Sequence, residues 1–160
     1  MFAKSSTPTP TTHPRSAVAV MYGGLALTVA TLVVLYVDQA TTDTLGAHIR
    51  AGYPDYSAAR IDEAVTLWLV YLSALGALGI VTWLTLARAT RRGRPWARWA
   101  APVAFLAGGS VALFNLLVRD TSGDTGLPAL LGVTGLLPAV AGAVAVALLW
   151  RHTRTVPRGR

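Results

Sequence analysis

The sequence contains no cysteine among its 160 residues. Disulfide bonds, thiol redox chemistry and thiolate metal sites are therefore excluded, and with them the chemistry of four-helix thiol oxidoreductases. Charged residues are scarce as well, at 13%, where a soluble domain has about 25%. Because 53% of the residues are hydrophobic, this composition is typical of a chain that lies in a membrane.

Four apolar runs without a charged residue make up most of the chain, and each holds 20 to 24 residues. At about 1.5 Å per residue, a helix of that length crosses about 30 Å of hydrocarbon. The first run is too long for a cleaved signal peptide and lacks a small-residue cleavage site, which favours a retained anchor. The sequence predicts an all-α fold, a four-helix transmembrane bundle. The predicted spans are 17–37, 64–87, 99–118 and 127–150.

The charges are divided unequally between the two sides of these spans. Eleven basic residues and no acid fall on the side of the termini and the 88–98 loop, whereas three arginines and all seven acids fall on the other. Positive charge accumulates on the cytoplasmic side, so we predict an inner (plasma) membrane, multi-pass protein with both termini cytoplasmic. Nucleic acid is not a predicted partner. Residues 1–16 are predicted to be a disordered tail, and 151–160 a basic tail.

The external loop 38–63 is the only long one. Leu45, His48 and Ile49 share one face of a short predicted helix within it. A second helix beginning at about residue 57 is expected to continue through the second span to about residue 91. At about 1.5 Å per residue, that helix would project beyond the membrane.

Turn-forming residues predict the remaining connections. Gly93 should end the helix of the second span, and Pro95 suits the first turn of the next, so these helices are expected to form a tight antiparallel hairpin. On the other side, Asp124 or Thr125 is predicted to cap the fourth helix, with Pro128 in its first turn.

Small residues recur at every fourth position in the third and fourth spans. Helices in lipid associate through close contacts at small side chains, so both stripes are predicted to face neighbouring helices, within the bundle or in a homo-oligomer. The first span has a shorter stripe, Ala19 and Gly23. The longer stripes are Ala100, Ala104, Gly108 and Ala112, and Gly135, Ala139, Ala143 and Ala147.

None of the four spans contains an aspartate, glutamate, lysine, arginine or histidine. Proton- and cation-coupled transporters place an ionisable group at membrane depth, and small multidrug exporters rely on a carboxylate in the first span. Intramembrane proteases need a Ser–His pair or two aspartates at depth. The spacing of His48 and the external acids matches no compact ligand motif. The sequence therefore predicts no catalytic residue, no metal and no cofactor.

Three residues are tentative polar or hinge positions: Asn115, Thr134 and Pro138. Asn115 is either a solute contact at an outward mouth or an interhelical hydrogen-bonding group, and the second interpretation is favoured. Pro138 leaves the Thr134 carbonyl without its helical donor. The result is either a hinge with a small polar pocket or only a change of helix shape, and again the structural interpretation is favoured.

Arginines and tryptophans mark the predicted cytoplasmic interface. Tryptophan prefers the headgroup level, and clustered arginines attract anionic lipids with about 1 kcal/mol per residue near the surface. Anionic lipids at the cytoplasmic face are therefore predicted partners. The predicted anchors are Arg91, Arg92, Arg94, Trp96, Arg98, Trp99 and Trp150.

Two stretches carry a resemblance to a known kind of protein. They are Tyr-Pro-Asp-Tyr-Ser-Ala-Ala-Arg-Ile-Asp at 53–62, before a span, and Arg-Gly-Arg-Pro-Trp-Ala-Arg at 92–98, after it. They resemble small, uncharacterised four-helix membrane proteins common in GC-rich bacteria, over residues 17–118. The resemblance implies the four-helix architecture and carries no activity.

The lack of intramembrane chemistry favours a non-enzymatic accessory or regulatory component of the cell envelope, with another membrane protein as partner. The alternative is an oligomeric transporter or channel for a neutral or hydrophobic solute, whose path Asn115, Thr134 and Pro138 would line. A hydrated cavity near Pro138 would separate the two hypotheses.

Overall fold

The computed structural model describes residues 13–151. Over this range the chain forms five helices, one isolated antiparallel bridge between Arg119 and Thr125, and no strand. Residues 1–12 of the predicted disordered tail and 152–160 of the predicted basic tail lie outside this range. The helices are α1 (His13–Thr41), α2 (Thr44–Gly52), α3 (Ala58–Arg91), α4 (Ala97–Leu117) and α5 (Ala129–Arg151).

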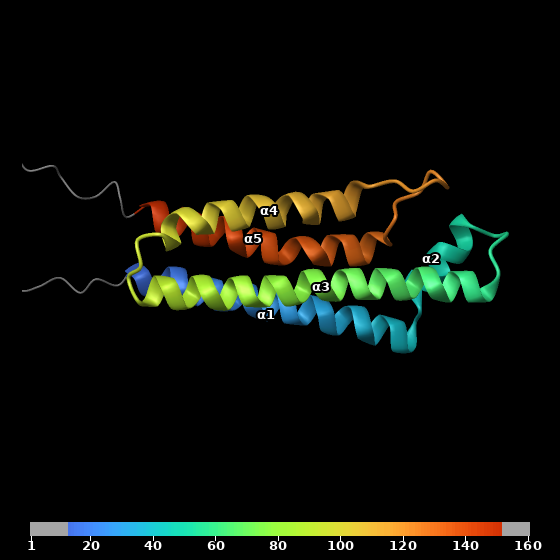
Figure 1. Ribbon diagram of the computed structural model, residues 1–160, viewed down its shortest axis with the longest axis horizontal. Helices are drawn as coiled ribbons and strands as arrows, with labels where there is room; N and C mark the ends of the chain where they lie inside the picture. The colour runs from blue at the N-terminus through green and yellow to red at the C-terminus, as the bar shows by residue number, and fades with distance from the viewer. Residues whose placement is uncertain (1–12, 152–160) are drawn as a thin grey trace, which may run out of the picture.

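Four helices, α1, α3, α4 and α5, are long and apolar enough to cross a membrane. They run along the long axis of the molecule, and the short helix α2 lies at one end, here called the α2 end (Figure 1). At the opposite end, here called the terminal end, α1 begins and α5 finishes (Figure 1). The predicted all-α, four-helix membrane bundle is therefore confirmed.

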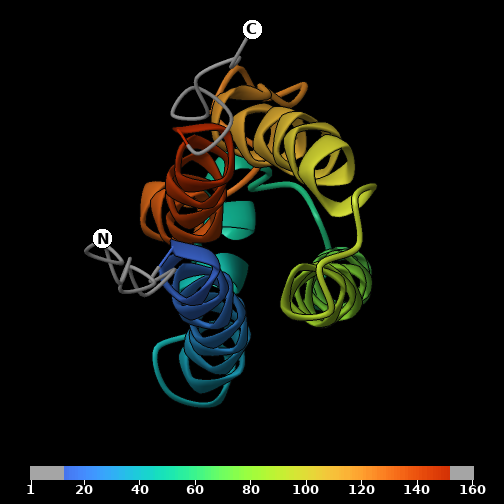
Figure 2. The same ribbon diagram turned by 90° about the vertical axis from the view of Figure 1, so that its left-hand side faces the viewer.

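The bundle has a gap between two helices that are consecutive in the chain. α1 packs against both α3 and α5, and α5 packs against α4, whereas α3 and α4 touch much less. The end-on view shows the bundle open between them (Figure 2). The predicted tight hairpin is therefore wrong. Its turn forms, but α3 directs Gly76 and Gly79 against Leu32 and Thr28 of α1, so α3 packs on α1 and separates from α4.

α3 has the predicted length. Its 34 residues extend roughly 51 Å, beyond the roughly 30 Å of a hydrocarbon core. Ser57 caps its first turn, with the Oγ atom accepting a hydrogen bond from the Arg60 backbone N–H at 3.4 Å. Gly93 follows its last turn with a φ of 65°, a conformation that glycine adopts without strain. Gly93 is thus the predicted helix stop.

The turn predictions at the other two helix starts are wrong. Pro95 precedes the first residue of α4, Ala97, and lies in a turn instead of the helix. The Thr125 hydroxyl donates to the Leu127 carbonyl at 2.9 Å and does not cap α5. Pro128 lies one residue before α5, where its carbonyl accepts the first helical hydrogen bond, from the Gly132 N–H at 3.0 Å.

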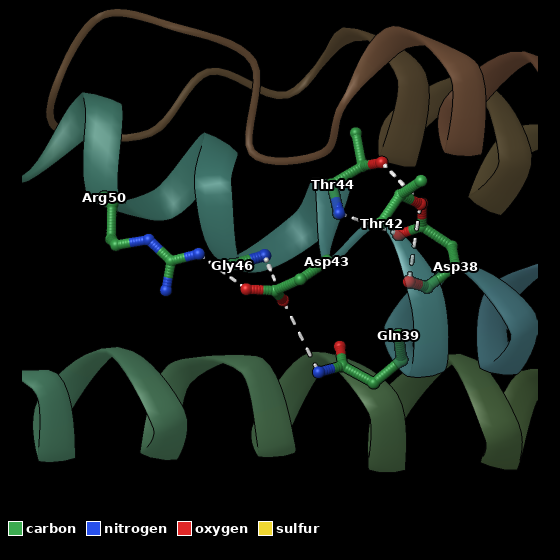
Figure 3. A network of polar contacts seen from close by, with 7 residues as sticks. All are labelled: Asp38, Gln39, Thr42, Asp43, Thr44, Gly46 and Arg50. Carbon is green, nitrogen blue, oxygen red and sulfur yellow. Dashed lines mark hydrogen bonds and ion pairs between the residues drawn. The ribbon is translucent and has the colours of Figure 1, made fainter.

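A polar network turns the chain from α1 into α2 (Figure 3). The Asp38 carboxylate accepts hydrogen bonds from the hydroxyl and the backbone N–H of Thr44. Asp43 has a left-handed backbone, with φ 46°, and caps α2 by accepting from the Gly46 N–H at 3.2 Å. Arg50 pairs with the other oxygen of Asp43 at 2.5 Å. Short-range polar contacts therefore hold α2 folded back over the bundle.

Two buried apolar clusters pack the ends of the bundle. At the α2 end, Leu45 and Ile49 bury the predicted apolar face of α2 against α1, α3 and the start of α5. At the terminal end, α1, α3, α4 and α5 meet around Met21, which is 1% exposed. The first cluster comprises Leu35, Leu45, Ile49, Ile61, Val65, Leu127 and Leu131; the second comprises Met21, Leu86, Ala87, Ala101 and Ala145.

Candidate functional site

A cavity of about 390 Å³ lies between the four membrane helices. Small-molecule sites range over about 300–1,000 Å³. The described residues that line this cavity are mostly leucine, alanine and glycine, and none of them is ionisable. Its lining extends from Leu35 and Asn115 near the α2 end to Met21 and Ala145 near the terminal end. The cavity is therefore an apolar slot parallel to the bundle axis.

This slot is packed at both ends and open along one side. Leu127 at the α2 end, and Met21 and Leu86 at the terminal end, belong both to its lining and to the buried clusters. Its open side lies between α3 and α4, which touch little, and there the lining residues Leu78 (63% exposed) and Gly108 are exposed. At this depth in a membrane the surroundings are hydrocarbon. We call this slot the lateral groove.

All three tentative polar or hinge positions, Asn115, Thr134 and Pro138, lie in the wall of the lateral groove. Pro138 leaves the Thr134 carbonyl without a helical donor, and the Thr31 hydroxyl of α1 lies 3.3 Å from that carbonyl. The same hydroxyl lies 2.9 Å from the Leu27 carbonyl, so the two acceptors share one proton. The proline thus helps tie α5 to α1. No local pattern marks Thr31 in the sequence, because its partner is 103 residues away.

Asn115 lies at the α2 end of the lateral groove and is 8% exposed. The Tyr71 hydroxyl of α3 donates a hydrogen bond to Asn115 Oδ1 at 3.0 Å. Tyr71 also packs edge-on against Trp68, with ring centroids 5.7 Å apart. This hydrogen bond bridges α3 and α4, the two helices that otherwise diverge. The favoured interhelical role of Asn115 is therefore observed, together with a place in the groove wall.

Only part of the two long small-residue stripes packs within the bundle, and their contact in a homo-oligomer stays a prediction. A Cβ added at Gly108 or Gly135 would meet no neighbouring atom within 4 Å, since both line the groove, and Ala143 is exposed. α4 and α5 approach each other instead at Gly132, where an added Cβ would lie 2.8 Å from the Leu116 side chain. The members of the two stripes that line the groove leave space between the helices, and that space is part of the groove.

The short stripe of the first span makes no close contact within the bundle. Ala19 and Gly23 are exposed, whereas Gly24 lies under the indole ring of Trp83, which a Cβ would overlap. The Trp83 Nε1 donates to the Thr28 hydroxyl oxygen at 3.1 Å. α1 and α3 are therefore joined by a partly buried aromatic ring, and the glycine that admits it is the one next to the predicted position.

Three of the predicted interface anchors form one cluster at the terminal end. The rings of Trp99 and Trp150 pack edge to face with centroids 5.0 Å apart, and the Arg98 guanidinium lies 5.7 Å from the Trp99 centroid. Trp150 Nε1 donates to the Arg98 carbonyl oxygen at 3.2 Å. That carbonyl has no backbone donor within α4, because the residue four positions further on, Pro102, has no N–H. The anchors Arg91, Arg92, Arg94, Trp96, Arg98, Trp99 and Trp150 are all exposed.

At the other end, α2 is fastened to the loop between α4 and α5. His48 Nε2 donates to the Thr125 carbonyl at 2.6 Å, and the hydroxyls of Tyr53 and Thr121 share a hydrogen bond of 2.7 Å. Burial raises the pKa of the nearby Asp120 carboxyl, but hydrogen bonds from Ser122 and Tyr53 and the charge of His48 together outweigh this effect and lower the pKa below its usual value. Asp120 is therefore charged at neutral pH. Within residues 13–151, no three His, Asp or Glu side chains are placed to hold a metal ion.

No family profile, curated protein or solved structure matches this chain. The lateral groove and the polar groups in its wall therefore provide the basis for a functional proposal.

Proposed function

We propose that this chain is a multi-pass membrane protein that binds the hydrocarbon chain of a lipid in the lateral groove, without catalysing a reaction. The observation that carries the proposal is a cavity of about 390 Å³ that opens sideways between α3 and α4, at membrane depth. An apolar ligand can reach such a site from the bilayer without crossing water.

Packing would have to select this ligand, because lipid tails are as apolar as the groove and hydrophobic transfer favours neither environment. A shaped slot gains dispersion contacts that a disordered bilayer chain does not make. A protein that holds a lipid in this way would serve as an accessory component of the cell envelope. That role is the one that the sequence favours.

We also propose that the terminal end faces the cytoplasm and contacts anionic lipids. The support is charge: the acids lie at the α2 end, whereas the anchor arginines surround the terminal end. Cytoplasmic loops are enriched in arginine and lysine, and each basic residue near an anionic surface contributes about 1 kcal/mol.

A transporter for a hydrophobic solute is the second candidate. Asn115, Thr134 and Pro138 all line the groove, as a solute path through these residues requires. The groove belongs to one chain, so this version needs no oligomer. Reconstitution into liposomes with a fluorescent lipid analogue tests it. Transfer of the analogue between leaflets above the rate of protein-free liposomes would favour this candidate over a static binding role.

Native mass spectrometry of the protein released from membranes in a mild detergent tests lipid binding. The informative variant is Gly135→Leu, which directs a side chain into the groove from a position where a Cβ meets no neighbour. Ala143→Leu is the matched control, because it adds the same side chain to an exposed position of α5 outside the groove.

We expect the unmodified protein and Ala143→Leu to retain one lipid, and Gly135→Leu to lose it. A protein that emerges free of lipid, or that retains the same lipid in all three forms, would overturn the proposal. Circular dichroism of each form checks that the helices are intact.

A further inference from the structure

We infer that Asn115 donates a hydrogen bond to an ester carbonyl of a glycerophospholipid whose acyl chain occupies the lateral groove. This inference rests on the proposed function and names its ligand. Asn115 is 8% exposed, lines the groove, and uses Oδ1 to accept from Tyr71. Within residues 13–151, its amide nitrogen has no hydrogen-bond partner. An amide donor that faces hydrocarbon is costly unless an acceptor meets it.

The orientation of the Asn115 amide follows from its neighbour. Within the described residues, Oδ1 is the acceptor for the Tyr71 hydroxyl proton. Turning the amide over would place its nitrogen against the phenol oxygen and leave the phenol proton without an acceptor. The observed orientation satisfies both groups. It leaves the two N–H bonds of Asn115 for a ligand.

The other polar groups of the groove wall are already engaged within the protein. The Thr28 hydroxyl donates to the Gly24 carbonyl at 2.9 Å. The Thr82 hydroxyl donates to the Leu78 carbonyl at 2.8 Å. The hydroxyls of Thr31 and Thr134 likewise donate to backbone carbonyls. The amide of Asn115 is thus the hydrogen-bond donor that the groove offers to a ligand. The matching ligand group is an acceptor oxygen, such as that of a carbonyl.

The depth of Asn115 matches the ester level of a lipid leaflet. Asn115 lies two residues from the end of α4 at Leu117, and the lining of the groove continues along α4 to Ala101. That length is roughly 21 Å at about 1.5 Å per residue, compared with about 15 Å for half of a 30 Å hydrocarbon core. An ester carbonyl at Asn115 therefore leaves its acyl chain fully within the groove.

The charge beyond Asn115 favours a phospholipid. Arg119 follows α4 on the water side of Asn115, is exposed, and forms no ion pair within residues 13–151. A phosphate group just outside the ester would meet this guanidinium. A free fatty acid would instead bring its own charge to Asn115, where no lining residue is basic. An isoprenoid quinone has the carbonyl but lacks the phosphate.

The test offers the protein an equal mixture of two phosphatidylglycerols in nanodiscs, one ester-linked and one ether-linked, with the same chain length. The ether lipid lacks only the carbonyl oxygens. Native mass spectrometry then measures which lipid is retained. We expect the ester lipid to be enriched about two- to tenfold, as the loss of one neutral hydrogen bond implies. Asn115→Leu should retain lipid without this preference.

Two further variants separate ligand binding from a structural role. Thr82→Val removes a groove hydroxyl that is already engaged, and should keep the preference. Tyr71→Phe breaks the bridge between α3 and α4 but leaves the Asn115 donor, so it too should keep the preference. Loss of the preference in Tyr71→Phe would mean that Asn115 acts only through the bridge, which overturns the inference.

The outcomes distinguish this inference from the proposal on which it rests. Equal retention of ester and ether lipids by the unmodified protein would overturn the inference and leave lipid binding intact. Retention of neither lipid would overturn lipid binding itself. In a second run, an isoprenoid quinone is added to the same nanodiscs. Displacement of both phospholipids by the quinone would also overturn the inference, because the ligand would then not carry a glycerophosphate headgroup.

Discussion

The indole Nε1 of Trp150 donates a hydrogen bond to the backbone carbonyl of Arg98, 3.2 Å away on the neighbouring helix. In a regular helix that carbonyl would accept from the N–H of residue 102, which Pro102 lacks. α5 repeats the arrangement: Pro138 frees the Thr134 carbonyl, and Thr31 lies within hydrogen-bonding distance of it. A carbonyl that a proline leaves without its helical donor can accept a hydrogen bond from a neighbouring helix, so each proline favours a link between two helices.

The link between Trp150 and Pro102 predicts a specific energetic coupling. Trp150→Phe removes the indole donor and should destabilise the protein by about 0.6–2 kcal/mol, the range for an interhelical hydrogen bond in a membrane protein. Pro102→Ala restores the backbone N–H at position 102, and the helix then satisfies the Arg98 carbonyl itself. In that background the same Trp150→Phe change should cost less.

Unfolding by denaturing detergent, applied to the four proteins of this double-mutant cycle, measures the coupling. The energy of the ring contact between Trp150 and Trp99 cancels in this cycle, because the contact is present in both backgrounds. Equal costs of Trp150→Phe with and without Pro102 would show that the indole does not compensate for the proline.

Adjacent glycines of α1 should respond very differently to alanine. A Cβ at Gly24 would overlap the Trp83 ring and push it away from Thr28, whereas a Cβ at Gly23 meets nothing within 4 Å. We expect Gly24→Ala to destabilise by about 1–3 kcal/mol, as overpacking does, and Gly23→Ala to have little effect. Thermal unfolding monitored by tryptophan fluorescence compares them. Equal melting temperatures would mean that the ring does not pack on Gly24.

Asp43 should contribute to stability through its cap and its backbone more than through its ion pair. Asp43→Asn keeps a side-chain acceptor for the Gly46 N–H and tolerates the left-handed backbone, so its effect should be small. It removes the ion pair with Arg50, whose side chain is 51% exposed, and exposed pairs contribute about 0–1 kcal/mol. Asp43→Ala loses the cap as well, at a cost of about 0.5–2 kcal/mol.

Hydrogen exchange of the α2 amides measures this difference. Faster exchange across Thr44–Gly52 is expected for Asp43→Ala and not for Asp43→Asn. If the two variants exchange equally fast, the ion pair with Arg50 would be the dominant contact.

Local patterns predicted some contacts and missed others for a consistent reason. The apolar face of α2, the start of α3 near Ser57 and the stop at Gly93 depend on residues within a few positions of one another, and each prediction is correct. The hairpin of α3 and α4 and the stripes containing Gly108 and Gly135 depended on which helix lies opposite. The hairpin prediction is wrong, and within the chain the stripes pack only in part.

The candidate site follows the same division. Asn115 stands out in the sequence as the one amide side chain of the four predicted spans, and Thr134 follows from Pro138, four residues further on. Tyr71 and Thr31, which contact Asn115 and Thr134, do not stand out, since each lies far away along the chain. Pro102 lies inside α4, and its interhelical role becomes visible only through the contact of Trp150 with the Arg98 carbonyl.

The sequence by itself determined four apolar helices, because hydrocarbon requires each backbone N–H and C=O to be satisfied within its own segment. It also determined that all seven acids lie on one side of those helices and eleven of the fourteen basic residues on the other. Only the tertiary structure decided which helices touch, because in lipid that choice depends on the fit of individual side chains such as Trp83 on Gly24. The lateral groove is a consequence of that choice: α3 packs on α1, α4 packs on α5, and the small residues between them leave the space open.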